Sequence, residues 1–213
     1  MAASGSPSRA SNAKPRFERQ AADARRRALV DATIASLKRH GHDGLSVRSI
    51  AAQAGVSVGL INHHFPNKDE LVAEAFRHFY RQLIDEQARA VAGAGSSPRA
   101  RLHAFFRATF SAPNLDRDVL TAWIVFWSLH RHSVEIQRAH DDTYRHYIEL
   151  VRGLLGGLGE SGKLRMSLRA ASIGLAALLD GLWLTWCLDP DTFSPREGIQ
   201  LCEAWIDGLC EAP

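Results

Sequence analysis

The stretch LSVRSIAAQAGVSVGLINHHFPNKDEL, residues 45–71, has the clearest structural pattern in the chain. It has the pattern of two short helices joined by a tight turn and followed at once by the start of another helix. Ser46 and Ser57 each precede an apolar-periodic run, and we expect their hydroxyls to cap these two helices. Gly55 supplies the positive φ that a short turn between helices requires. Two short helices crossing at an Ala-Gly-Val corner predict a helix-turn-helix, whose second helix enters the major groove of DNA.

Helical periodicity continues on both sides of this motif. A stripe of apolar residues within 29–37 predicts a helix from about Ala22 to Gly41, which would complete a three-helix head. Asn67 begins a long helix that we expect to run to about Val91. No stretch alternates with period two for long enough to form a sheet, so the sequence predicts an all-α fold of about nine helices. The remaining helices are expected at about 98–111, 117–130, 133–156, 166–188 and 195–210.

Composition and charge divide the chain into three parts. Residues 1–20 are rich in Ser, Ala, Pro and Arg without periodicity and are predicted to be a flexible basic arm. Residues 21–66 form the predicted DNA-binding domain, and residues 67–213 the predicted ligand-binding and dimerisation body. Residues 1–68 hold 11 Lys or Arg against 4 Asp or Glu, whereas the remainder holds 15 against 19. A basic end on a near-neutral body fits phosphate binding at that end, although a solvated basic tail would have the same composition.

Aromatic residues gather in the body, where all five tryptophans lie beyond residue 120. Trp123 and Trp127 are one helical turn apart and share a face, as do roughly Trp183 and Trp186. Two aromatic walls with a buried acid are what a quaternary ammonium ligand requires, and two phenylalanines are candidates for a third wall. The alternative is that tryptophans at helical spacing are simply core residues. The candidate ligand-binding residues are Phe106, Phe110, Trp123, Trp127, Asp180 and Trp183.

The last two expected helices are apolar on most sides, so they must be buried on most sides. We expect them to form a homodimer interface, in which pairs from two subunits build a four-helix bundle; a purely intramolecular core is the alternative. Asp180 interrupts the most apolar stretch, which predicts a buried helix and no membrane span. Three cysteines without a disulfide framework, and no signal peptide, indicate a reduced, cytoplasmic protein.

Residues 22–71 resemble the TetR family of one-component transcriptional regulators. The resemblance rests on Ile50-Ala51, Ala54-Gly55-Val56-Ser57, Gly59, Phe65, Lys68 and Leu71. In the body, AWIVFW at 122–127 and LDGLWL at 179–184 look like the BetI-type subgroup, which represses choline-to-glycine-betaine genes. The resemblance implies a dimer on a palindromic operator in double-stranded DNA, released when a small molecule enters the body. The implied effector is choline or a betaine precursor.

The resemblance also implies which residues touch DNA. Ser46 and Arg48 occupy positions that contact phosphate or groove in the family, the recognition helix reads the groove, and His64 and Lys68 lie on phosphates. The family more often has Tyr at the position of Asn62, and an acid at the position of Ser49. Basic residues such as Arg26 add counterion-releasing charge, so binding should weaken steeply with salt. The candidate DNA-binding residues are Arg26, Ser46, Arg48, Ser57, Gly59, Leu60, Asn62, His63, His64 and Lys68.

Other functions remain possible from the sequence. The effector can instead be another lipophilic or aromatic ligand, as in repressors of efflux or catabolic operons. A DNA-packaging protein without an effector is an alternative from another class, although the large apolar body argues against it. The sequence contains no phosphate-cradling glycine loop, nucleophile elbow or metal-binding helix motif. We therefore expect no enzyme, no cofactor and no metal site.

Overall fold

The computed structural model describes residues 16–161 and 164–210, and the regular structure in these ranges is helical apart from an isolated β-bridge between Leu164 and Cys210. The all-α prediction of about nine helices is confirmed. A 3₁₀ helix, η1 (Gly41–Leu45), was not expected and links the first helix to the helix-turn-helix. The α-helices are α1 (Arg16–His40), α2 (Val47–Ala54), α3 (Val58–His64), α4 (Lys68–Ala92), α5 (Pro98–Thr109), α6 (Arg117–Leu129), α7 (Val134–Ser161), α8 (Leu168–Leu188) and α9 (Pro195–Leu209).

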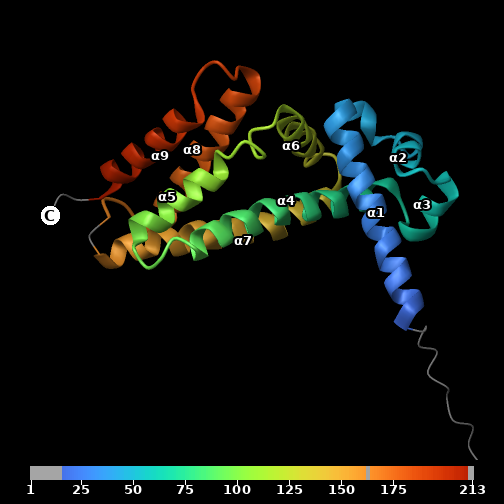
Figure 1. The fold of residues 1–213 in the computed structure, drawn as a ribbon, viewed down its shortest axis with the longest axis horizontal. Coiled ribbons are helices and arrows are strands. Elements are labelled where there is room, and N and C mark those ends of the chain that lie inside the picture. The colour runs from blue at the N-terminus through green and yellow to red at the C-terminus, as the bar shows by residue number, and fades with distance from the viewer. Residues whose placement is uncertain (1–15, 162–163, 211–213) are drawn as a thin grey trace, which may run out of the picture.

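The helices form a head and a body (Figure 1). The head consists of α1, α2 and α3, and the far end of the body consists of α5, α8 and α9. The long helix α4 runs from the head along the body with α7 packed beside it, and α6 lies between the two parts. One apolar core follows α4 from head to body, through the buried Leu71, Phe76 and Leu83. The head is therefore joined to the body by a continuous packed core.

Local capping forms the helix-turn-helix as the sequence predicts. The Ser46 hydroxyl accepts a hydrogen bond from the Ser49 amide at 3.0 Å, and the Ser57 hydroxyl accepts one from the Leu60 amide at 3.3 Å. Gly55 ends α2 with φ at 65°, in the left-handed region. The Ser49 hydroxyl lies 2.7 Å from that of Ser46, so a serine pair stands where the family more often has a capping acid.

Two predicted boundaries are wrong. The predicted arm, residues 1–20, falls mostly on residues 1–15, which are outside the described residues, but residues 16–20 belong to α1. Residues 16–28 are mainly Arg, Glu, Gln and Ala, which favour helix without any apolar stripe. At the other end, α7 continues to Ser161, because buried leucines such as Leu154 and Leu158 keep its packing through the glycine-rich stretch.

The predicted burial of α8 is correct for only one face of the single chain. Leu175, Leu179 and Trp183 are buried, but Ile173 and Leu184 on the opposite side are 48% and 42% exposed. By length and composition alone α8 is apolar enough to cross a membrane, with 33% of its most apolar window buried. The helix packs against α6, α7 and α9 within the fold.

Candidate DNA interface and effector cavity

The recognition helix α3 sits at the outer edge of the head with one face in solvent (Figure 1). Ile61 and Phe65 anchor it in the core at 1% and 0% exposure. A Cβ added at Gly59 would meet nothing closer than the Ser57 hydroxyl at 3.9 Å, so the glycine leaves open space on the outer side. The candidate DNA-binding residues that are exposed on this side of the head are Ser46, Arg48, Ser57, Gly59, Asn62, His63 and Lys68; Arg26, Leu60 and His64 are half-buried.

Charge on this surface is available for phosphate. Among the described residues, neither Arg48 nor Lys68 forms an ion pair with a carboxylate. Burial, followed by the nearby charges of His63, Arg25 and Arg26, lowers the pKa of His64. At neutral pH His64 is therefore an uncharged imidazole, able to form a hydrogen bond with a phosphate but not a full ion pair.

Arg26 has a structural role that sequence reasoning missed. Its Nη1 donates a hydrogen bond to the carbonyl oxygen of His64 at 2.9 Å, and its guanidinium lies 4.1 Å from the centre of the Phe65 ring. The C-terminal carbonyls of a helix have no partners within the helix, so this bond fixes the end of α3 to α1. A DNA contact by Arg26 stays a prediction.

A small cavity lies inside the body, between α4, α6, α7 and α8. Its volume is about 40 Å³. It brings together four of the predicted ligand residues, Trp123, Trp127, Asp180 and Trp183. Three tyrosines that the sequence did not single out complete the aromatic walls: Tyr80, Tyr144 and Tyr147. In the sequence, only the helical spacing of Tyr144 and Tyr147 could have indicated a shared face. All three tyrosines lie near the tryptophans because of how α4 and α7 pack.

The predicted third wall of Phe106 and Phe110 is not found. The two side chains are one helical turn apart and share the face of α5 that points toward α9. Phe106 lines an outer groove that includes Ile206 of α9, and Phe110 packs edge-on against Phe193, with ring centres 6.4 Å apart. Thr109 on a neighbouring face of the same helix reaches the cavity instead.

The rings of the cavity are packed around Trp123. Its ring centre lies 5.0 Å from that of Tyr80, 5.7 Å from that of Trp183 and 6.2 Å from that of Trp127. The faces of aromatic rings carry partial negative charge and attract cations. An aromatic lining of this kind favours a cationic guest.

The polar groups of the cavity favour positive charge. Asp180, as a residue, is exposed in the single chain because the outer face of α8 is uncovered, yet protein atoms crowded around its carboxyl raise its pKa to about 6. Burial lowers the pKa of His140, so this imidazole is uncharged at neutral pH. The described lining thus offers an acid and no cation.

Two buried polar atoms of the lining have no hydrogen-bond partner within the described residues: Gln87 Oε1 and Trp183 Nε1. The orientation of the Gln87 amide is fixed by its surroundings. Thr109 Oγ1 donates to the Phe105 carbonyl at 2.9 Å, so it accepts from Gln87 Nε2, also at 2.9 Å. Gln87 Oε1 is left as a free acceptor and Trp183 Nε1 as a free donor, each of which is unfavourable without a partner.

Comparison with known proteins agrees with this geometry. Residues 29–75 match the bacterial regulatory proteins of the tetR family, and residues 98–211 match the C-terminal region of BetI-type transcriptional repressors. The chain belongs to the TetR family. Its body is of the BetI type, and it is 36% identical over 186 residues to the HTH-type transcriptional regulator BetI of Burkholderia thailandensis, covering 87% of this chain and 93% of that one.

Solved structures of TetR-like regulators share the fold. A transcriptional regulator from Pseudomonas aeruginosa PAO1 has a TM-score of 0.81 and 47% identity, over 92% of this chain and 95% of that chain. A transcriptional regulator from Saccharomonospora viridis, crystallised in complex with choline, has a TM-score of 0.77 and 22% identity, over 89% of this chain and 100% of that chain. TetR-family proteins are DNA-binding regulators that respond to small molecules, and their members are not enzymes.

Proposed function

We propose that this TetR-family protein is a choline-released repressor that binds a palindromic operator as a dimer in the cytoplasm, with no membrane attachment. The observation that carries the proposal is the aromatic cavity around Trp123, which has Asp180 at its edge and no cation in its described lining. Ring faces attract a methylated cation, and a carboxylate balances its charge. The choline-bound neighbour from Saccharomonospora viridis supports the same ligand.

The unpartnered atoms of the lining favour a ligand that carries a hydroxyl group. A hydroxyl both donates and accepts hydrogen bonds, which matches the acceptor Gln87 Oε1 and the donor Trp183 Nε1. Choline has this hydroxyl two carbons from its ammonium group. Glycine betaine has a carboxylate in place of the hydroxyl. This carboxylate would lie near the acceptor Gln87 Oε1 and the negative charge of Asp180, and the described lining has no positively charged side chain to pair with it.

The cavity must widen to admit the ligand, and this links binding to the head. Its volume of about 40 Å³ is enough for roughly three water molecules at ~10–15 Å³ each, less than choline needs. Trp123 belongs to α6, and Thr121 of the same helix faces Gly41 of η1, where an added Cβ would lie 3.6 Å from its methyl carbon. Displacement of α6 by the ligand would therefore shift the head.

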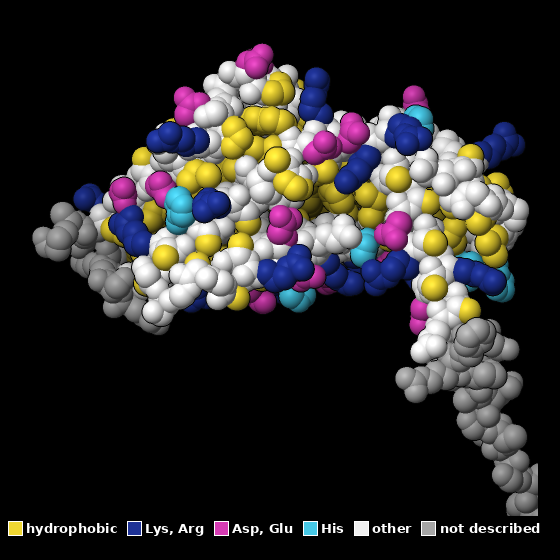
Figure 2. Space-filling model, viewed as in Figure 1, with side chains coloured by type: hydrophobic (Ala, Val, Ile, Leu, Met, Phe, Trp, Pro, Cys, Tyr) yellow, Lys and Arg dark blue, Asp and Glu magenta, His cyan; other side chains and the backbone are white. Residues whose placement is uncertain are grey.

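The uncovered face of α8 and α9 supports a homodimer. Ile173, Leu184, Leu188 and Leu201 are 48%, 42%, 74% and 50% exposed. Figure 2 shows hydrophobic side chains gathered over this region. Burying such a patch against a second copy would place two heads side by side, each presenting α3 to one half of a palindrome.

Fluorescence titration tests the effector. Because several tryptophans line the cavity, choline should quench their emission saturably, whereas glycine betaine should do so only at far higher concentration. Gln87→Leu keeps a similar volume but removes the acceptor, and it should reduce the preference for choline over tetramethylammonium. If a lipophilic cation quenches the tryptophan emission and choline does not, the effector is a lipophilic ligand, as in repressors of efflux operons. If no small molecule quenches it, an effector-independent DNA-binding protein is favoured.

A further inference from the structure

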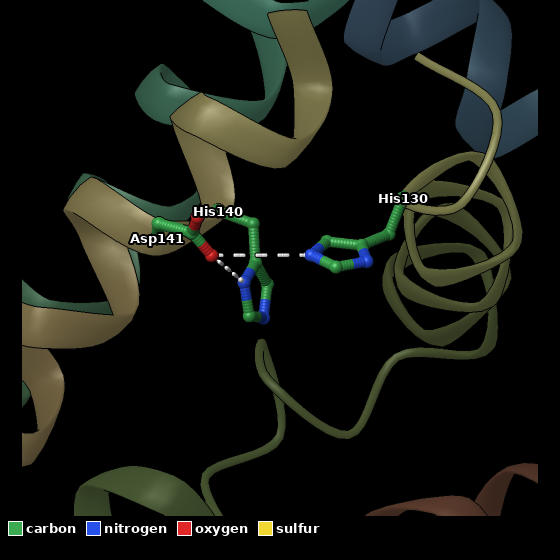
Figure 3. Close-up of side chains that lie close together, drawn as sticks. All are labelled: His130, His140 and Asp141. Carbon is green, nitrogen blue, oxygen red and sulfur yellow. Dashed lines mark hydrogen bonds and ion pairs between the residues drawn. The ribbon is translucent and has the colours of Figure 1, made fainter. Parts of the chain in front are cut away.

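Three metal-ligating side chains meet at the junction of α6 and α7 (Figure 3). His130 lies in the turn that follows α6, and His140 and Asp141 lie in the first half of α7. Figure 3 shows the Asp141 carboxylate turned toward both imidazoles. The cluster does not belong to the DNA surface, and only His140 also lines the aromatic cavity.

The distances in this cluster are close to those of a coordination shell. Asp141 Oδ1 lies 3.4 Å from His140 Nδ1 and 4.0 Å from His130 Nε2, and one ligand atom from each residue falls within 4.8 Å of the others. Tetrahedral bonds of about 2.0–2.2 Å place ligand atoms roughly 3.3–3.6 Å apart. The Asp141–His140 pair already has this spacing, and His130 Nε2 would have to move closer to complete the set.

One ring nitrogen of His130 is buried without a hydrogen bond in the described part of the chain. Its Nε2 is buried, and no hydrogen-bond partner is found for it among the described residues. A buried imidazole nitrogen without a partner is unfavourable, and a bound ion would satisfy it. The ring centres of the two histidines are 4.6 Å apart with the ring planes at 74°, and one nitrogen of each lies within 4.8 Å of the other.

We propose that His130, His140 and Asp141 bind a divalent transition-metal ion of the Zn²⁺, Co²⁺ or Ni²⁺ type. Imidazole nitrogens suit these ions, whereas Ca²⁺ and Mg²⁺ are bound mainly by oxygen. Asp141 is exposed, so water can complete the coordination on its side. No metal-binding motif predicts this site in the sequence, because His130 lies in the turn after α6 and His140 in α7, ten residues further along the chain.

A bound ion would tie the end of α6 to α7. His140 stacks on Tyr144 with their ring centres 5.3 Å apart, and both line the cavity. The ion would therefore hold one wall of the cavity and the helix that touches η1 in a fixed relation. The ion would bind beside the cavity through His140, and Asp141 would offset one of its two positive charges. The metal proposal holds whether or not the effector is choline.

Cobalt titration of untagged, metal-free protein tests the site. We expect one Co²⁺ per chain to bind saturably, with the intense visible absorption of a four-coordinate ion, and Zn²⁺ to displace it. His130→Ala and Asp141→Asn should each weaken binding by about 100-fold or more, because losing a ligand should exceed the 10–100-fold cost of losing an outer-shell partner.

Matched controls are His132→Ala and His146→Ala, which remove exposed histidines from the same turn and the same helix. Both should bind Co²⁺ like the unaltered protein. Far-ultraviolet circular dichroism and melting of each metal-free variant establish that it is folded. The proposal is overturned if the unaltered protein shows only weak, unsaturable binding, if the controls lose as much affinity as His130→Ala, or if folded His130→Ala binds normally.

Discussion

At the scale of single residues, the structural role of Arg26 can be tested without DNA. Arg26→Ala removes the hydrogen bond to the His64 carbonyl and the cation–π contact with Phe65. We expect a loss of about 1–2 kcal/mol in the free energy of unfolding, from a charged hydrogen bond and a partly exposed cation–π pair. Urea denaturation measures this loss. Arg25→Ala, an exposed neighbour, is the control and should unfold like the unaltered protein; equal stability of the two variants would contradict the structural role.

Asp180 should make effector binding depend on pH. Its pKa is raised to about 6 from 3.8, so the carboxylate is lost as the pH falls through 6, and choline loses its counter-charge. The Kd for choline should therefore rise below pH 6, whereas folded Asp180→Asn should bind weakly with little pH dependence between 5 and 8. Tryptophan quenching at several pH values measures both. Parallel pH profiles for the two proteins would count against this role.

The raised pKa of Asp180 should also make the stability of the folded protein depend on pH. The folded protein binds the Asp180 proton more tightly than the unfolded chain does, so this group favours folding at low pH and loses that contribution as the pH rises through about 6. Ligand-free Asp180→Asn should thus have a higher Tm than the unaltered protein at pH 8. The difference should shrink at pH 4.5. A lower Tm for the variant at pH 8 would contradict the assigned cause.

At the scale of elements, two glycine substitutions should act in opposite directions. A Cβ at Gly44 would overlap the Ser36 carbonyl oxygen, since η1 packs directly on α1, whereas a Cβ at Gly153 of α7 meets nothing within 4 Å. Gly44→Ala should destabilise the protein by about 1–3 kcal/mol or more, and Gly153→Ala should stabilise it by about 0.5–1 kcal/mol. Thermal melting of both variants checks the pair. A melting temperature unchanged by Gly44→Ala would rule out this packing of the head.

The sequence predicted those elements that depend on neighbours along the chain. Ser46, Gly55 and Ser57 define the helix-turn-helix within a dozen residues, because capping and turn geometry are local. The cavity was predicted in part, since its tryptophans share helix faces. Tyr80 and Gln87 could not be found from the sequence, because only the packing of α4 against α6 and α7 brings them to the cavity.

At the scale of the whole molecule, dimerisation through α8 and α9 should be required for operator binding. Leu184→Glu places a charge on the exposed apolar face of α8 and should yield a folded monomer, because an unpaired carboxylate is unfavourable in a buried interface. Light scattering after size exclusion gives the mass, and anisotropy with labelled operator DNA gives the affinity. Val134→Glu alters an exposed apolar residue outside these helices and should remain dimeric. If the Leu184→Glu protein stays dimeric, the dimer interface does not include this face of α8.

Choline bound in the body should release the head from a specific DNA site. Footprinting on the DNA upstream of the protein's own gene, with and without choline, tests it most directly. We expect two symmetric protected half-sites that disappear as choline is added and persist with glycine betaine. Protection that choline leaves unchanged, or uniform protection without sequence preference, would contradict the account.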